Sequence, residues 1–77
     1  MPTRVLIELR TPEDPQWDRV GVFSAPPLEV ETLRKVLERH GNPIDALPHL
    51  PRGLLWDALD SIRENGWLAR VTFVEDN

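Results

Sequence analysis

The chain has 77 residues, of which nine are Lys or Arg and 13 are Asp or Glu, so its formal net charge is −4. This length predicts a single domain, residues 1–77, near the lower limit for a self-sufficient core, and makes partner binding or self-association a reasonable expectation. The absence of cysteine excludes disulfides, thiol nucleophiles and cysteine-ligated zinc or iron–sulfur centres. An acidic balance with no basic segment opposes binding to polyanions.

The N-terminal third predicts two strands. In Thr3–Arg10 the apolar residues alternate with charged ones, which indicates a half-buried strand. The prolines of residues 11–16 interrupt the pattern because they cannot continue a strand ladder. A second strand is expected over Asp18–Phe23, with Val20 and Val22 as its apolar positions.

The N-terminus MPTRVLIELRT is expected to form this first strand and not a signal peptide, because Glu8 and Arg10 break its apolar run. No apolar run approaches the roughly 18 residues that a membrane-spanning helix needs. These two observations together predict a cytoplasmic location.

The first helix is expected to open within SAPPLEVE, with Ser24 as its cap, and to end at Gly41. Its apolar face is predicted from the helical spacing of Val30, Leu33, Val36 and Leu37. On the other faces, the i, i+4 spacing predicts the ion pairs Glu31–Lys35 and Arg34–Glu38.

A proline-rich connector over residues 42–53 follows, in which only Ile44–Leu47 is expected to form a helical turn, because Pro48 and Pro51 interrupt it. The second helix is predicted over Arg52–Asn65, where Asn65-Gly66 is a stop signal. Its predicted core stripe consists of Leu54, Leu55, Ala58, Leu59 and Ile62.

The last strand is predicted over Trp67–Val74, and residues 75–77 are expected to form a frayed tail. The expected fold is therefore α+β, in the order β-β-α-α-β, with two helices packed on one face of a three-stranded antiparallel sheet. Because Arg70 is the only charge in WLARVTFV, this strand is poorly protected for an edge. We expect it to lie centrally, and at an edge it would pair with a second copy or another protein.

Part of the chain resembles the second half of a winged helix-turn-helix domain, over about residues 43–74. LPRG at 50–53, LLWDALDSIRENG at 54–66 and WLARV at 67–71 resemble the turn, the recognition helix and the following strand, with Leu33–His40 in the place of the first helix. The resemblance implies a DNA-binding transcriptional regulator in which Arg52, Trp56 and Arg63 face nucleic acid. The acidic residues of that helix oppose phosphate contacts, so this function stands second.

The leading interpretation concerns the same three side chains. In a helix each residue is turned 100° from the one before, which places Trp56 away from the centre of the core stripe. Arg52 and Arg63 would point in nearly the same direction as Trp56. Arg and Trp are enriched among interface hot spots, so these residues, with Trp17, are predicted to contact another protein. In the alternative, Trp56 folds over the edge of the core and the arginines pair with Asp60 and neighbouring carboxylates.

The remaining polar residues predict no chemistry. His40 is expected to be partly buried at the end of the first helix, and His40, Asp45 and His49 lack the spacing of a metal site. Ser24 and Ser61 have no placed histidine base, and no phosphate-binding glycine motif occurs. We therefore expect no catalysis, no metal and no cofactor.

The predicted function is a small, non-catalytic cytoplasmic interaction domain that serves as a regulator, inhibitor or accessory subunit. Its expected partner is another protein or a second copy of itself, and nucleic acid and membrane are not expected. A third alternative, a dimer that binds a small molecule, has no specific residue in its favour.

Overall fold

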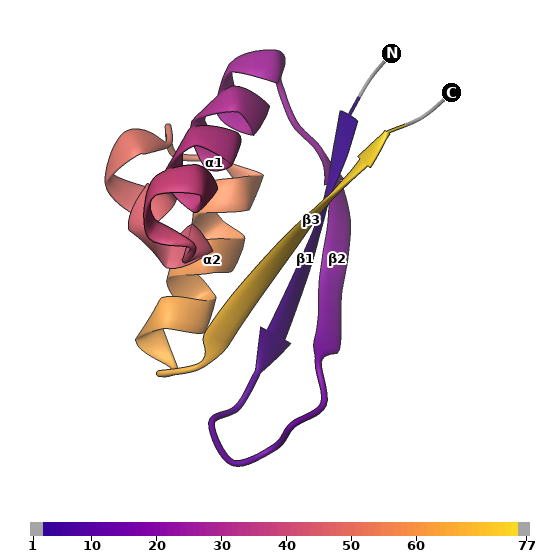
Figure 1. Cartoon of the computed structure of the whole chain (residues 1–77), viewed down its shortest axis with the longest axis vertical. Coiled ribbons are helices and arrows are strands. Elements are labelled where there is room, and N and C mark those ends of the chain that lie inside the picture. The colour runs from indigo at the N-terminus through magenta and orange to yellow at the C-terminus, as the bar shows by residue number, and fades with distance from the viewer. Residues whose placement is uncertain (1–2, 76–77) are drawn as a thin grey trace.

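The computed structural model describes residues 3–75 and confirms the predicted α+β fold, with the helices packed together on one side of a three-stranded antiparallel sheet (Figure 1). Among these residues, no helix combines the length and apolar composition needed to cross a membrane. The elements in chain order are β1 (Thr3–Arg10), β2 (Asp18–Ser24), α1 (Pro27–His40), the 3-10 helix η1 (Pro43–His49), α2 (Leu54–Glu64) and β3 (Leu68–Glu75).

The strand order is β2-β1-β3, and both pairings are antiparallel. The expectation that the last strand lies centrally is therefore wrong, because β1 takes that place and β3 lies at an edge. β1 carries the two strand residues with no exposed surface, Val5 and Ile7. The central strand of a sheet has neighbours on both sides, and its inward-facing side chains lie under the middle of the helical layer. The strand with the most apolar inward face, β1, is therefore favoured at the centre.

The predicted second strand is present as β2, but the valines around which it was predicted do not face the helices. Val20 and Val22 are 39% and 41% exposed, whereas Phe23 packs against the core. The β1–β2 pairing shifts register between Ile7 and Glu8, and this bulge sets Gly21 opposite Ile7 and Phe23 opposite Val5. A Cβ atom at Gly21 would lie 3.2 Å from the Phe23 ring, so the glycine leaves room for the larger side chain to face the helices.

Helix α1 begins at Pro27, and Pro26 occupies the N-cap position without a side-chain hydrogen bond. Ser24, the predicted cap, is instead the last residue of β2. The predicted end is confirmed, because Gly41 adopts a left-handed conformation with φ +71° and its N–H donates to the Leu37 carbonyl at 3.0 Å. The predicted apolar face is buried at Val30, Leu33 and Val36, and Leu37 is half-buried.

Arg34 of α1 pairs with β3 instead of its predicted partner Glu38. Its Nη2 atom lies 2.8 Å from Oε1 of Glu75, and its guanidinium lies 4.4 Å from the centre of the Phe73 ring. Glu75 is the last residue of β3, opposite Thr3, and so does not belong to a frayed tail. The rest of that predicted tail, 76–77, lies outside the described residues.

The connector forms a longer helical segment than predicted. Asn42 accepts a hydrogen bond from the Ile44 N–H at 3.0 Å, and η1 then continues through Pro48 to His49. Proline fits because its φ is close to the 3-10 value and only one donor is lost. Buried Ala46 and Leu47 pack η1 against α1 and α2.

Helix α2 is shorter than predicted, and one residue of its predicted stripe is misplaced. Leu55, Leu59 and Ile62 are buried and Ala58 is partly buried, but Leu54 is 70% exposed. Leu54 is the first residue of the helix and lies 100° around the axis from Leu55, so it points past the core.

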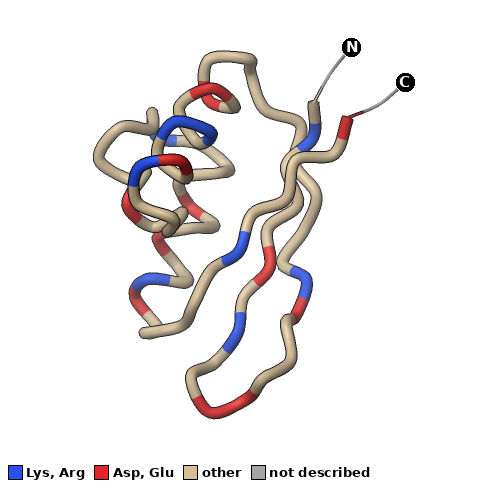
Figure 2. The backbone as a smooth tube through the Cα atoms, in the orientation of Figure 1, with Lys and Arg blue, Asp and Glu red and all other residues tan. Residues whose placement is uncertain are grey.

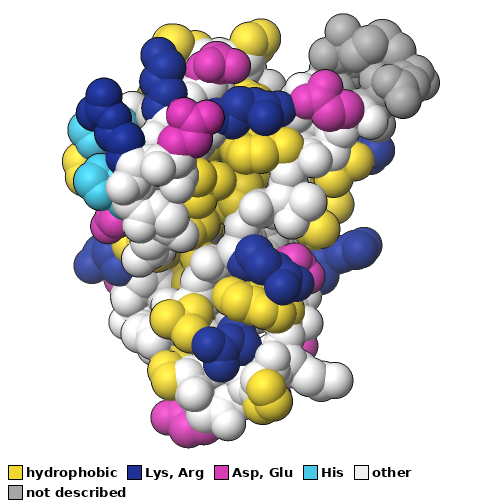
Figure 3. Space-filling view, viewed as in Figure 1, with side chains coloured by type: hydrophobic (Ala, Val, Ile, Leu, Met, Phe, Trp, Pro, Cys, Tyr) yellow, Lys and Arg dark blue, Asp and Glu magenta, His cyan; other side chains and the backbone are white. Residues whose placement is uncertain are grey.

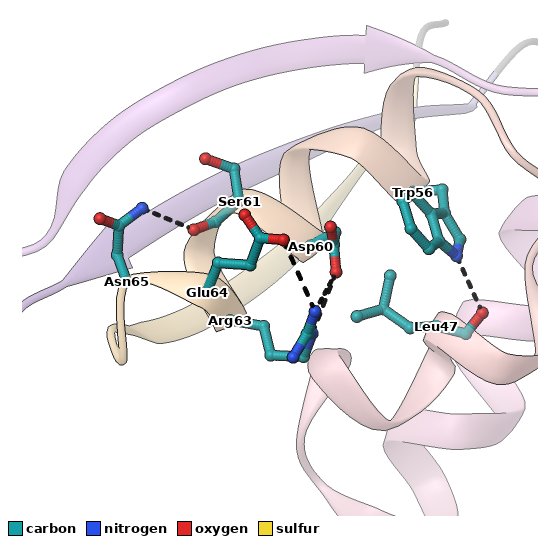
Figure 4. Close-up of polar contacts among 7 residues, drawn as sticks. All are labelled: Leu47, Trp56, Asp60, Ser61, Arg63, Glu64 and Asn65. Atoms are coloured by element: carbon teal, nitrogen blue, oxygen red, sulfur yellow. Dashed lines mark hydrogen bonds and ion pairs between the residues drawn. The ribbon is translucent and has the colours of Figure 1, made fainter.

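The predicted stop of α2 is confirmed. The Asn65 side chain donates to the Ser61 carbonyl at 2.8 Å (Figure 4), and Gly66 has φ +72°. The Trp67 N–H returns to the Ile62 carbonyl at 3.1 Å, which turns the chain into β3. Along the backbone, basic and acidic residues are interspersed over both layers (Figure 2).

Candidate functional site

Trp56 lies at the junction of α2 and η1. Its ring is partly buried against the core, and its Nε1–H donates to the Leu47 carbonyl at 3.2 Å (Figure 4). A buried indole needs such an acceptor for its polar edge. The hydrogen bond therefore fixes the orientation of the ring and links the two helical elements.

Arg52 lies over the exposed side of this ring. Its guanidinium carbon is 3.6 Å from the ring centre, at the distance of a close cation–π contact. Within residues 3–75, Arg52 has no carboxylate within ion-pair distance. Its N–H groups are therefore held in place by stacking and remain available to an external acceptor.

Arg63 is engaged by its own helix. Its Nε and Nη2 atoms lie 3.0 and 2.6 Å from Oδ1 of Asp60, and Glu64 is 3.9 Å from Nη2 (Figure 4). The hydrogen bonds to Asp60, and then the attraction of its charge, raise the pKa of Arg63 above the ordinary arginine value. An exposed pair of this kind adds little stability, but it neutralises Arg63 and orients both side chains. Arg63 therefore follows the alternative prediction, in which the arginines pair with Asp60 and neighbouring carboxylates.

These residues surround one open depression of about 910 Å³, here called the Trp56 groove. Its floor comes from η1 and the segment that follows it, and one wall comes from α2. It is lined by Ile44, Asp45, Leu47, Pro48, Leu50, Arg52, Trp56, Asp60, Arg63 and Glu64. Its breadth and openness suit a segment of another protein better than a small molecule, which needs an enclosing pocket.

Trp17 lies outside this groove. Its ring is held by the guanidinium groups of Arg70 and Arg10, at 4.4 and 5.4 Å from the ring centre. It lines a smaller depression of about 270 Å³ with Arg10 and Trp67. Ile44 lines both hollows, so Trp17 is a neighbour of the predicted contact face and not a member of it.

The two histidines come together in a third place. His40 and His49 line a shallow depression of about 180 Å³ with Lys35 and Arg39, and Figure 3 shows histidine and basic side chains grouped at one corner of the molecule. His40 is exposed, so its predicted partial burial is wrong; Gly41 ends the helix and leaves the side chain in solvent. Asp45 lines the Trp56 groove instead. Within residues 3–75, no three side chains of metal-ligating type are grouped.

The sequence prediction missed the floor of the groove. Ile44, Leu47 and Leu50 were assigned to a connector, yet they line the groove beneath Trp56. Their spacing of three residues is the period of a 3-10 helix, which is the signal that identifies them.

In comparisons with known proteins, the chain matches no protein-family model, no curated protein and no solved structure. The winged-helix resemblance therefore rests on the sequence motif alone. Any functional assignment has to be argued from the geometry of the groove.

Proposed function

We propose that this chain is a small, non-catalytic cytoplasmic domain that acts by binding another protein, as a regulator, inhibitor or accessory subunit. The observation that carries the proposal is the Trp56 groove, in which a fixed tryptophan bears an arginine with no carboxylate partner among residues 3–75. Tryptophan and arginine dominate binding energy at protein interfaces when they are preorganised beside an apolar floor.

The chemistry of the groove specifies the segment that fits it. The floor of Ile44, Leu47 and Leu50 is apolar and accepts an apolar side chain. Arg52 presents donors beside this floor, whereas Arg63 is already neutralised by Asp60. The partner segment therefore carries an apolar residue flanked by a carboxylate that reaches Arg52, which forms a charge-assisted hydrogen bond.

The test compares Arg52→Glu with wild-type chain in photo-crosslinking and affinity capture from the native host. Reversing the charge at an exposed side chain repels the partner carboxylate and removes the stacked cation, so we expect capture of the partner to fall about thirtyfold, as for a hot-spot residue. Trp56→Ala is expected to reduce capture to a similar extent. Circular dichroism checks that both variants remain folded.

Arg39→Glu is the matched control. Arg39 is exposed on α1, outside the Trp56 groove, and the substitution makes the same change of charge. A partner that is retained by Arg39→Glu and lost by Arg52→Glu supports the proposal. Equal capture by all variants contradicts it.

The winged-helix function has less support from the arrangement of α2 and β3. The exposed residues of α2 include Asp57 and Glu64, which repel phosphates. After α2 the described chain forms one strand, β3, which pairs with β1 and not with a following wing strand. In a gel-shift titration with duplex DNA we expect no retarded band even at low salt, where phosphate contacts are strongest. A band that weakens steeply as salt rises would restore the DNA-binding alternative.

A further inference from the structure

The outer edge of β3 is a long, regular strand edge. Within residues 3–75, β3 pairs on one side only, with β1. That pairing runs without interruption over eight residue pairs, from Thr3 opposite Glu75 to Arg10 opposite Leu68. An edge of this kind exposes unpaired backbone N–H and C=O groups, which form a template for a further strand.

The two edges of the sheet differ in their protection. β2 contains the bulge opposite Ile7 and Glu8 and begins with two charged residues, Asp18 and Arg19. Bulges and charges are devices that prevent strand addition. β3 has no bulge and no proline, and its interior carries one charge, Arg70. The unprotected edge is therefore β3.

The charged side chains of β3 form ion pairs within the same chain. Arg70 extends across the open face of the sheet, with Nη2 2.9 Å from Oε1 of Glu8 and its guanidinium over Trp17. Glu75 is drawn to the helical layer by Arg34 at 2.8 Å. Both charged side chains are thus directed back over the domain, which leaves the backbone edge accessible.

The edge is complementary to a second copy of itself. Ala69, Val71 and Phe73 face the helices and Leu68, Thr72 and Val74 face the other side, so both faces of β3 carry apolar groups. In an antiparallel pair, residues directly opposite each other share a face. A two-fold axis at Val71 or Thr72 therefore continues both faces across the joint. Parallel pairing in register would instead set Arg70 beside Arg70 and Glu75 beside Glu75.

We propose that the chain forms a symmetric dimer through antiparallel pairing of its β3 edges. The product is a six-stranded sheet with both helical layers on the same face. The interface is isologous and closes at two copies, because each chain has one unprotected edge. This surface is separate from the Trp56 groove, so the dimer does not depend on the function proposed above.

The test is sedimentation equilibrium of the full chain over a range of concentrations, with Thr72→Lys as the variant. Thr72 is exposed on the open face at the middle of β3, so the folded monomer tolerates the change. In either register, the added ammonium lies opposite its own counterpart or opposite Arg70 of the second copy. The contact with Arg70 occurs twice when the axis lies at Val71, and the two ammonium groups meet on the axis when it lies at Thr72. In both registers we expect the dimer dissociation constant to rise about tenfold or more.

Val22→Lys is the matched control. Leu6 of β1 has Thr72 on one side and Val22 on the other, so the two variants place the same charge at equivalent positions on opposite edges. We expect Val22→Lys to dimerise like the wild-type chain. A wild-type monomer, an unchanged constant for Thr72→Lys, or equal weakening by both variants would overturn the proposal.

Hydrogen–deuterium exchange of the wild-type chain provides a test without any variant. Dimerisation at β3 should protect backbone amides of β3 more strongly as concentration rises, with β2 unchanged. Concentration-independent exchange in β3 contradicts the dimer. None of these measurements uses the external partner or the groove variants, so either proposal can fail without the other.

Discussion

Leu59→Ala is expected to lower the free energy of unfolding by about 3 kcal/mol, within the range for leucine truncation in a core. Leu59 has no exposed surface and lies at the centre of the face of α2 that covers the sheet. For a domain of this size, that loss is a large share of the total stability and lowers the melting temperature by more than about 10 °C. Urea unfolding followed by circular dichroism measures it.

Leu54→Ala makes the same chemical change on the same helix and is the control. Leu54 is 70% exposed, so its truncation should change the free energy of unfolding by less than about 0.5 kcal/mol. The pair tests which side of α2 faces the sheet, since the sequence pattern assigned both leucines to the core. Similar losses for both would contradict the orientation of the helix.

Ile7→Ala is expected to cost about 3 kcal/mol, for a reason that concerns the sheet. Ile7 lies in the central strand with no exposed surface, beneath the helices and between Gly21 and Val71. Its removal leaves a cavity that the rigid central strand closes poorly. Urea unfolding provides the measurement.

Leu6→Ala is the matched control, one residue earlier in β1 and on the opposite face of the sheet. Leu6 is only half-buried and faces the side without helices, so we expect a loss of about 1 kcal/mol or less. A loss at Leu6 as large as that at Ile7 would show that the open face is covered in solution. Repeating the measurement at several protein concentrations separates a covering second copy from a covering intramolecular contact.

Local sequence patterns predicted the elements well where a short-range signal, such as apolar alternation or a glycine, determines the backbone conformation. Alternation in β1 identified which of its residues face the helices, because side chains of a strand point to opposite faces with a period of two. Gly41 and Asn65-Gly66 identified the helix ends, because left-handed backbone conformations favour glycine. The α2 stripe was right at Leu55, Leu59 and Ile62 and wrong at Leu54, where the helix extends beyond the surface that it covers.

The candidate site was predicted only in part. Arg52, Trp56 and Arg63 line one groove, although Arg52 precedes α2 and the predicted helical bearing therefore applies only to Trp56 and Arg63. The partners of these side chains were beyond the pattern, because the Leu47 carbonyl that accepts from Trp56 belongs to η1. Whether this groove binds a partner stays a prediction.

The sequence by itself determined the order of the elements, the inward face of β1 and the acidic, cysteine-free composition, since each depends on residues close together in the chain or on composition alone. The tertiary structure alone decided the strand order, the inward face of β2 and the ion pair of Arg34 with Glu75, residues 41 positions apart. Contacts of this kind form only when the sheet and helices pack. That packing selected the edge strand and formed the Trp56 groove, the two surfaces from which an interaction is proposed.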